Sequence, residues 1–154
     1  MLGSRNKVGN PKNDDFYTPK WVFDQMGLVF DVDVCSPAGG TGLVPASKFY
    51  SIEDDGLASD WHGRVWMNPP YSNASPWIAK FIDHNNGVAL IPTSKAIWFS
   101  NIWNSATAIK LMNPKFKFER PDGNRKDIFM PLVLVALGAD NADAIKRVDG
   151  NNVR

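Results

Sequence analysis

Hydrophobic residues along the chain form short continuous runs separated by stretches with helical spacing. The apolar runs at 64–67 (RVWM), 87–92 (GVALIP) and 107–112 (TAIKLM) predict buried strands. Between them, apolar residues recur at helical spacing over 75–85 and 94–105. Strands that alternate with helices in this way predict an α/β fold, in which a mostly parallel sheet carries helices on both faces.

The amino-terminal part of the pattern predicts a helix, a strand and a glycine-rich turn. Thr18 before Pro19 is typical of a capped helix, which we expect to run to about Leu28. Alternating apolar and acidic residues at 29–36 (VFDVDVCS) predict a strand that leads into the turn 37–42 (PAGGTG). Because ligands bind at the carboxyl ends of strands in such sheets, this turn is a candidate binding site.

The carboxyl-terminal part of the pattern predicts antiparallel structure. Residues 115–120 (KFKFER), the turn 121–124 (PDGN) and the apolar run 127–137 (DIFMPLVLVAL) predict a hairpin that closes on a long strand. Between the glycine-rich turn and Trp61, only 48–52 (KFYSI) has strand character. An irregular connection of this length is usually functional.

The length of 154 residues and the apolar share of 44% fit one folded domain. We expect this domain over 14–148, after a polar segment 1–13 that is expected to be flexible because it has few apolar residues to bury. No apolar stretch approaches the roughly 18 residues of a membrane span, the amino terminus lacks a signal-peptide core, and Cys35 has no second cysteine to pair with. These features predict a soluble cytoplasmic protein that does not bind membranes.

The net charge of +1 excludes a protein that binds nucleic acid through bulk positive charge. A local strip is more informative, because six basic residues oppose only Glu119 and Asp122 within it: Lys110, Lys115, Lys117, Arg120, Arg125 and Lys126. Such a strip is a candidate surface for phosphate groups. A solvated hairpin without a ligand would have the same composition.

The stretch Asn68-Pro69-Pro70-Tyr71 stands directly after a predicted buried strand. The exocyclic amine of a nucleobase is a poor nucleophile, because its lone pair is delocalised into the ring. If the Asn68 side-chain oxygen and the Pro69 carbonyl each accept one amine hydrogen, the nitrogen is drawn towards tetrahedral geometry. Proline holds that carbonyl in place, and Tyr71 offers a ring on which the base stacks. Ordinary turn chemistry is the alternative explanation of the same residues.

Asn68-Pro69-Pro70-Tyr71 resembles the catalytic motif of amino-methyltransferases that use S-adenosylmethionine. Other fragments narrow the resemblance to phage-type DNA N6-adenine methyltransferases of the Dam family: DDFYTPKWVFD, DVCS, DDGLASDW, LIPTS and KFKF. The similarity spans about Asp14 to Leu137. It implies a Rossmann-like methyltransferase fold and transfer of a methyl group from S-adenosylmethionine to the exocyclic amine of adenine in DNA.

The resemblance also implies where the cofactor binds. In related enzymes a Thr-Pro near the amino terminus touches the methionine part of the cofactor, and an acidic group near its ribose or adenine would here be Asp54 or Asp55. A Phe-x-Gly-x-Gly turn is missing and the stretch between Asp33 and Asp55 is short, so we expect an abbreviated cofactor region that is open or completed by a partner subunit. The implied cofactor residues are Tyr17, Thr18, Pro19, Asp33, Ser36, Gly39, Gly40, Asp54 and Asp55.

For DNA, the resemblance implies that the extruded base lies between Tyr71 and an aromatic residue of the hairpin, for which Phe118 is the candidate. No separate region is large enough for target recognition, so DNA contacts are expected from the loop after Tyr71 and from the basic strip: Ser72, Asn73, Lys115, Lys117, Arg120, Arg125 and Lys126. His62 and His84 lack metal-ligand spacing, and we therefore predict no metal site.

Two other interpretations of the chain stay open. The same Asn-Pro-Pro-Tyr chemistry suits a methyltransferase that acts on cytosine in DNA, a guanine amine in RNA or a glutamine amide in protein. The shortened region before Asp55 fits a non-catalytic DNA-binding relative that has lost its cofactor. DNA is the expected partner of a DNA methyltransferase and of a DNA-binding relative alike, and assembly into a homo-oligomer stays open. If a phage encodes the protein, the expected location is the cytoplasm of the bacterial host.

Overall fold

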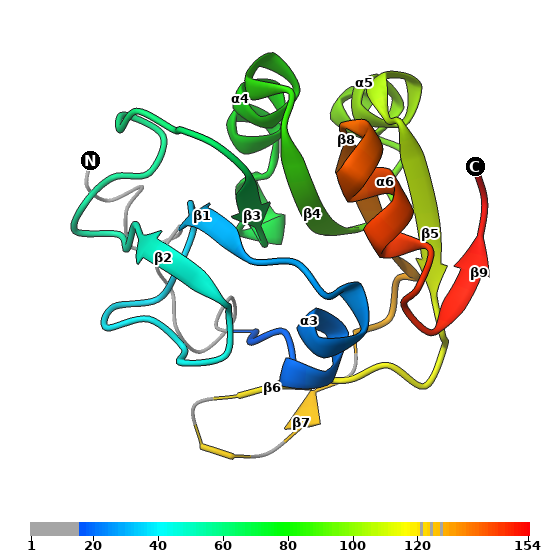
Figure 1. The fold of residues 1–154 in the computed structure, drawn as a ribbon, viewed down its shortest axis with the longest axis horizontal. Coiled ribbons are helices and arrows are strands. Elements are labelled where there is room, and N and C mark those ends of the chain that lie inside the picture. Colours follow the sequence, from blue (N-terminus) through cyan, green and yellow to red (C-terminus); the bar gives the residue numbers. More distant parts are fainter. Residues whose placement is uncertain (1–15, 121, 124, 127) are drawn as a thin grey trace.

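A computed structural model describes residues 16–154 except 121, 124 and 127, and the predicted flexible segment 1–13 lies outside this range. A central sheet of seven strands organises the described chain (Figure 1). In spatial order its strands are β2 (Ala46–Phe49), β1 (Phe30–Asp33), β3 (Val65–Met67), β4 (Gly87–Pro92), β8 (Leu132–Leu137), β5 (Ala108–Met112) and β9 (Gly150–Asn152).

The sheet combines a parallel half with an antiparallel half. Strands β2, β1, β3 and β4 pair in parallel, whereas β8 pairs antiparallel with both β4 and β5, and β9 pairs antiparallel with β5. Five of the seven strands therefore run in one direction. The predicted α/β class with a mostly parallel sheet is confirmed.

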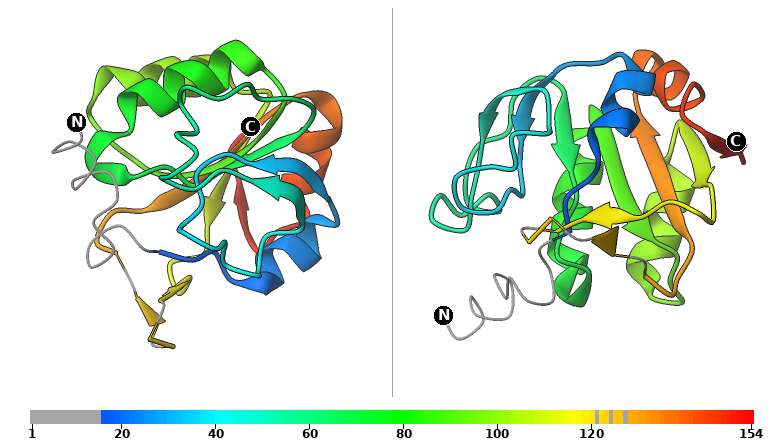
Figure 2. Two further views of the ribbon diagram at one scale, coloured as in Figure 1. Left: turned by 90° about the vertical axis from the view of Figure 1, so that its left-hand side faces the viewer. Right: turned by 90° about the horizontal axis from the view of Figure 1, so that it is seen from below.

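Helices cover both faces of the sheet (Figure 2). Along β4, Val88 and Leu90 join the core on one face, while Ala89 and Ile91 join the core on the other, and all four side chains are fully buried. A strand buried on both faces reads as a continuous apolar run, which is the pattern seen in the sequence. The first face carries α3 (Lys20–Met26) and α6 (Ala139–Ile145), and the second carries α4 (Ser75–His84) and α5 (Ile97–Ser105).

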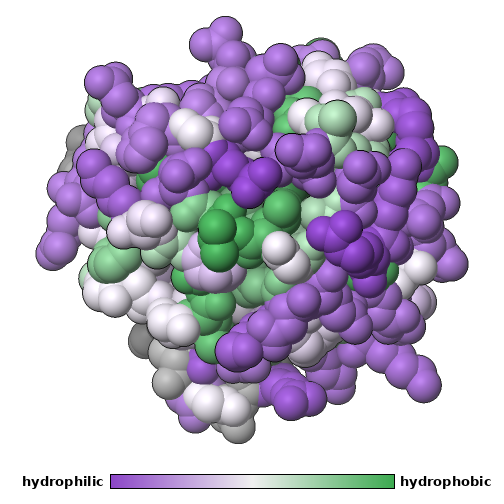
Figure 3. All heavy atoms as spheres, viewed as in Figure 1, coloured by the Kyte–Doolittle hydropathy of each residue, from purple (hydrophilic) through white to green (hydrophobic). Residues whose placement is uncertain are grey.

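In the view of Figure 3, apolar side chains gather near the middle of the molecule and hydrophilic residues surround them. Within the described part of the chain, none of the helices combines the length and the apolar character that a membrane crossing would need.

The carboxyl-terminal hairpin differs from the prediction. Strands β6 (Phe118–Glu119) and β7 (Arg125–Lys126) form a separate two-stranded sheet, and β8 instead enters the central sheet between β4 and β5. All six residues of β8 are buried, so they need a paired strand on each side, which a short charged hairpin does not supply. The predicted antiparallel hairpin is therefore present as β6 and β7, but the expectation that it closes on the apolar strand is wrong. An isolated bridge between Tyr17 and Glu119 joins β6 to the amino-terminal segment.

The start of α3 also departs from the prediction. Pro19 is the N-cap, the helix begins at Lys20, and no side chain caps it. Thr18 is only 3% exposed, and its hydroxyl oxygen has no hydrogen-bond partner among the residues that the structure describes. The predicted cap at Thr18 is wrong, because Pro19 occupies the N-cap position and the Thr18 hydroxyl makes no hydrogen bond to the first turn of the helix.

Lys110 does not face phosphate groups as the basic strip suggested. Its side chain is 2% exposed, and its Nζ donates to the carbonyl oxygens of Lys146 (2.9 Å) and Val148 (2.6 Å). These carbonyls follow α6, where helix carbonyls lack intrahelical partners, so the ammonium group satisfies them. Burial lowers the pKa of Lys110, and the carboxylate of Asp149 opposes part of that shift.

Replacement of Lys110 with methionine is expected to lower the free energy of unfolding by about 2 kcal/mol, because two carbonyls lose a charged donor. Urea denaturation of the variant and the wild type measures this difference. Lys146→Met is the matched control, since the side chain of Lys146 is exposed and only its carbonyl contacts Lys110. If Lys110→Met were as stable as the control, the capping role would be disproved.

Candidate active site

The segment Asn68–Tyr71, called the Asn68 turn below, begins where the buried strand β3 ends. All three residues of β3 are buried, and Asn68 is the first half-buried residue after them. Pro69 and Pro70 are buried, and Pro70 caps the short 3₁₀ helix η1 (Tyr71–Asn73) with φ at −66°. Proline has no N–H for the sheet ladder, so the two prolines end strand pairing at Asn68. This places the carboxamide at the carboxyl edge of the sheet.

Hydrogen bonds hold both ends of the Asn68 carboxamide. Its Nδ2 donates to the carbonyl oxygen of Phe16 at 2.8 Å, and its Oδ1 accepts from the Tyr71 hydroxyl at 2.8 Å. Because a carbonyl oxygen can only accept, the amide nitrogen must face Phe16 and the amide oxygen must face Tyr71. The orientation of this carboxamide is thus defined by its neighbours.

Tyr71 remains a neutral hydrogen-bond donor. Its hydroxyl lies 3.3 Å from the carbonyl oxygen of Leu90 in addition to its bond with Asn68. Burial raises the pKa of Tyr71 well above its usual value, and the nearby Cys35 thiol raises it further. The phenol therefore keeps its proton, and one lone pair of Asn68 Oδ1 stays engaged with it.

Aromatic rings surround the Asn68 turn. The Phe16 ring stacks on Phe118 with centroids 5.4 Å apart, and the Tyr71 ring lies 6.3 Å from Phe16 and 6.2 Å from Phe118. The predicted ring platform and the predicted hairpin aromatic are thus neighbours. Phe16 was not predicted as a site residue, although it stands one position before Tyr17. It contacts Asn68 through its backbone carbonyl, which every residue type has, so its side chain gave no signal in the sequence.

The carboxyl end of β1 carries a buried acid. Asp33 is 4% exposed, and its Oδ1 accepts a long hydrogen bond of 3.4 Å from the Cys35 backbone N–H. Burial raises the pKa of Asp33 to about 7, and the hydrogen bond from Cys35 lowers it only in part. Ser36 is also buried, and its hydroxyl donates to the Pro37 carbonyl at 3.2 Å.

The predicted glycine-rich turn follows these residues. Gly39 and Gly40 have φ angles of 79° and 76°, a left-handed conformation that glycine adopts without the steric cost other residues bear. Asp54 and Asp55 lie in a second turn after β2, where an Asp54 carboxylate oxygen accepts from the Ser51 N–H at 2.9 Å. Both aspartates are exposed, so the choice between them stays open.

Parallel pairing brings most of these predicted residues to one edge of the sheet. Asp33 is the last residue of β1, and the aspartate turn and Asn68 follow the carboxyl ends of β2 and β3. These strands are adjacent in the order β2-β1-β3. After β1 the chain forms β2 on one side of β1, and it then forms β3 on the other side of β1. Such a switch in strand order opens a crevice beyond the strand ends, where ligands bind in α/β proteins. Asp33 and Asn68 stand at the ends of β1 and β3, the two strands that meet at this switch point.

Comparison with known proteins gives a consistent result. A family model described as DNA N-6-adenine-methyltransferase (Dam) matches residues 5–152. The chain belongs to this family. It is 30% identical over 144 residues to the DNA N-6-adenine-methyltransferase of Haemophilus phage HP1 (strain HP1c1), covering 82% of this chain and 81% of the relative. It is 32% identical over 163 aligned positions to the DNA N-6-adenine-methyltransferase of Escherichia phage T1, covering 99% of this chain and 66% of the relative.

The Dam-family assignment confirms the predicted family and the predicted enzyme class, an adenine-specific DNA methyltransferase. The mixed α/β sheet described above is compatible with a methyltransferase-like fold. The roles of individual residues are not tested by these comparisons and stay predictions.

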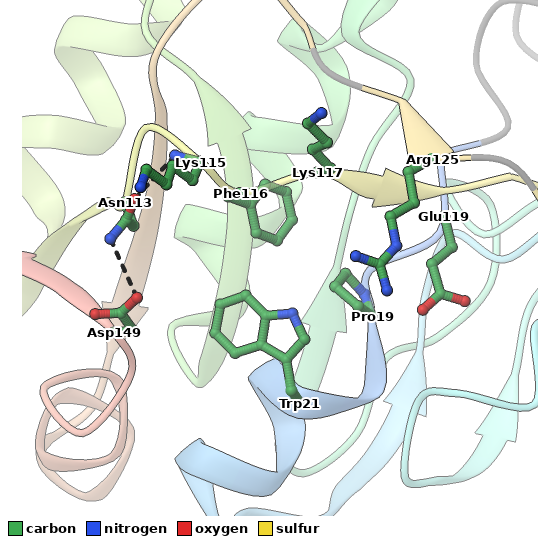
Figure 4. Close-up of a pocket in the computed structure, with 9 residues that line it drawn as sticks. All are labelled: Pro19, Trp21, Asn113, Lys115, Phe116, Lys117, Glu119, Arg125 and Asp149. Carbon is green, nitrogen blue, oxygen red and sulfur yellow. Dashed lines mark hydrogen bonds between the residues drawn. The ribbon is translucent and has the colours of Figure 1, made fainter.

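Several residues that were predicted to contact DNA lie together in this Dam-family protein. Lys115, Lys117 and Arg125 line a surface hollow of about 440 Å³ (Figure 4). Trp21 and Phe116 line it as well, with their rings edge to face and centroids 6.0 Å apart. Among the described residues that line this hollow, none belongs to the Asn68 turn. The basic residues therefore form a surface separate from the carboxamide.

The remaining DNA predictions fall in different environments. Ser72 and Asn73 are exposed in η1, directly after Tyr71, and the guanidinium of Arg120 lies 5.7 Å from the centre of the Phe16 ring. For Lys126 the structure describes the strand position only. Phe118 is 0% exposed, so a base could reach its ring only after neighbouring side chains move. Its contact with the base stays a prediction.

Proposed function

We propose that this protein transfers a methyl group from S-adenosylmethionine to the exocyclic amine of adenine in DNA, with Asn68 as the residue that orients the amine. The observation that carries this proposal is the carboxamide held between Phe16 and Tyr71. An amide oxygen has two lone pairs, and the Tyr71 hydroxyl uses one of them. The second lone pair remains for a hydrogen of the adenine amine.

Asn68 and Pro69 act together in this proposal. The Asn68 oxygen accepts one amine hydrogen and the Pro69 carbonyl accepts the other, which localises the nitrogen lone pair. Neither group is a strong base, so their contribution is orientation and electrostatic stabilisation of the developing positive charge. Tyr71 orients the Asn68 oxygen through its hydroxyl, and its ring is the proposed stacking surface for the extruded base.

The chemistry of two assigned residues, Thr18 and Asp33, fits S-adenosylmethionine, which supplies an electrophilic methyl group when bound. Thr18 has a buried hydroxyl without a described partner, and a buried polar atom in this state costs about 1–3 kcal/mol until a ligand satisfies it. Asp33 is a buried acid at the end of β1. We assign Thr18 and Asp33 to the cofactor, together with Tyr17, Pro19, Ser36, Gly39, Gly40 and either Asp54 or Asp55.

The strand order supports the Rossmann-like interpretation within the single domain proposed for 14–148. The switch in strand order at β1, with β2 on one side of it and β3 on the other, is the feature that Rossmann-like sheets use to bind nucleotides. Ser72, Asn73, Phe118 and the basic residues Lys115, Lys117, Arg120, Arg125 and Lys126 are the proposed DNA contacts. We propose that the reaction takes place in the cytoplasm of a bacterial host.

Product analysis tests the proposal directly. The purified full-length protein is incubated with DNA and methyl-labelled S-adenosylmethionine, and the DNA is then digested to nucleosides for mass spectrometry. We expect label in N6-methyldeoxyadenosine. Label in methylcytosine, or label only in parallel incubations with RNA or protein, would assign the other amine targets instead.

A calorimetric titration with S-adenosylmethionine separates enzyme from binding protein. We expect binding in the micromolar to millimolar range that is usual for enzyme substrates. DNA binding without detectable cofactor binding or methylation would identify a non-catalytic relative.

A further inference from the structure

The side chain of Lys80 joins α4 to the loop 54–61, which follows β2. Lys80 is half-buried, and its Nζ donates to the carbonyl oxygens of Leu57 (2.8 Å) and Ser59 (2.5 Å). The same Nζ lies 5.1 Å from the centre of the Trp61 ring. Hydrogen bonds from a charged donor are stronger than those between neutral groups, so one ammonium group fixes three positions of this loop to the helix.

Loop 54–61 is also braced from within. The Ser59 hydroxyl lies 2.9 Å from the Asp54 carbonyl oxygen and 3.0 Å from that of Asp55, and Trp61 Nε1 donates to the Gly56 carbonyl at 2.8 Å. Asp55 has a φ of 53°, a left-handed conformation that a residue other than glycine keeps only where its surroundings hold it. The shape of the loop, and with it the placement of both aspartates, therefore depends on these contacts.

The loop packs against the carboxyl end of β1. Gly56 lies so close to β1 that a Cβ added to it would stand 2.1 Å from the Val34 carbonyl oxygen. Tyr50 connects the same regions, because its hydroxyl donates to the Asp60 carbonyl at 2.7 Å and its backbone N–H donates to the Asp33 carbonyl at 2.8 Å. These contacts hold loop 54–61 beside the strand end at which Asp33 stands.

We propose that Lys80 is a positioning residue for S-adenosylmethionine, because it holds loop 54–61 in the shape in which Asp54 or Asp55 meets the ribose or adenine of the cofactor. This inference rests on the proposed function, which assigns one of these aspartates to the cofactor. Lys80 itself touches neither the cofactor nor the reacting amine. A loop that is already in its binding shape needs no ordering when the ligand arrives, and affinity falls with the fraction of molecules that have this shape.

Calorimetric titration of the full-length protein with S-adenosylmethionine measures this role. Lys80→Met removes the donors and keeps an unbranched side chain, and we expect its Kd to rise about tenfold or more because two charge-assisted hydrogen bonds no longer hold the loop. Lys80→Arg keeps a charged donor and is expected to recover most of the lost affinity. Lys146→Met changes an exposed lysine that follows α6, on the other face of the sheet, and should leave the Kd unchanged. A wild-type Kd for Lys80→Met would overturn the inference.

Steady-state methylation separates positioning of the cofactor from general damage. For Lys80→Met, the KM for S-adenosylmethionine is expected to rise with the Kd. The kcat at saturating cofactor and the KM for DNA should stay close to those of the wild type, because the Asn68 turn is unaltered. A lower kcat with an unchanged KM for the cofactor would mean that Lys80 does not act through cofactor binding.

A double-mutant cycle tests whether Lys80 acts through the aspartates of the loop. A variant with both Asp54→Asn and Asp55→Asn already lacks the proposed contact with the cofactor. Adding Lys80→Met to this variant should therefore raise the Kd for S-adenosylmethionine little further. Losses of affinity that add in full would overturn the proposed route from Lys80 through the loop.

Trp61→Phe provides a second test that does not depend on the stability of Lys80→Met. It keeps a ring beside Lys80 and removes only the donor to the Gly56 carbonyl, so we expect the Kd to rise about threefold. Thermal melting identifies the folded variants, and if Lys80→Met is unfolded, a wild-type Kd for folded Trp61→Phe would overturn the inference. A wild type that does not bind S-adenosylmethionine contradicts the proposed function, whereas equal binding by the wild type and Lys80→Met contradicts only the role of Lys80.

Discussion

Asn68→Ala is expected to lower the rate of adenine methylation by about 100- to 1,000-fold, the loss seen when an enzyme loses one preorganised polar group at its reacting centre. The variant lacks the amide oxygen that faces Tyr71 and would accept an amine hydrogen. It also frees the Phe16 carbonyl from its only described side-chain donor. Single-turnover rates with labelled cofactor and DNA measure the effect.

The fold and the cofactor site should survive this change. Asn68 is half-buried, and the loss of its two hydrogen bonds is expected to cost about 1–3 kcal/mol. Calorimetry should therefore give a Kd for S-adenosylmethionine close to that of the wild type. A variant that binds cofactor normally and methylates DNA at the wild-type rate would remove Asn68 from the mechanism.

Tyr71→Phe serves as the matched variant for Asn68. It keeps the ring and removes only the hydroxyl that donates to Asn68 Oδ1, so a smaller loss of rate is expected. If the hydroxyl acts only by orienting the carboxamide, Tyr71→Phe should have no further effect once Asn68 is alanine. Such non-additivity in a double-mutant cycle is the signature of two groups that work as one unit. Additive losses would assign the hydroxyl a separate task.

Local pattern was sufficient to predict the parts of the site that lie on single elements. The apolar run 64–67 and the two prolines after it predict a strand that ends at Asn68, because burial and the missing N–H groups act within a few residues. The glycine-rich turn 37–42 follows β1 for the same kind of reason. The edge shared by β1 and β3 then follows from parallel pairing alone.

Features that depend on distant contacts were not predictable in this way. Nothing in 127–137 indicates that β8 enters the sheet between β4 and β5, since that position depends on which strands lack a partner elsewhere. The sequence around Lys110 predicts a cation on the surface. Its partner, the carbonyl of Lys146 just after α6, lies 36 residues further along the chain and is known only from the structure. Phe16 contacts Asn68 through its backbone, which carries no sequence signal.

Asp33→Asn is expected to stabilise the cofactor-free protein at neutral and alkaline pH. The carboxyl has a pKa of about 7 in the folded protein against 3.8 in its ordinary state, because burial disfavours the charge. Between these two values the folded state holds a proton that the unfolded chain has lost, so stability falls as pH rises through this window. Below about pH 4 both states are protonated and the penalty vanishes. Above pH 7 the penalty is complete, at about 4 kcal/mol.

Urea denaturation of wild type and Asp33→Asn at pH 4, 6 and 8 tests this prediction. The difference in free energy of unfolding should be near zero at pH 4 and should grow towards an upper limit of about 4 kcal/mol at pH 8. Asp83→Asn, at an exposed position of α4, is the control and should show no such growth. A difference that stays constant with pH would mean that Asp33 does not titrate in this window. Because a buried acid that destabilises the fold is typical of a binding site, the stabilised Asp33→Asn variant should also bind S-adenosylmethionine more weakly than the wild type.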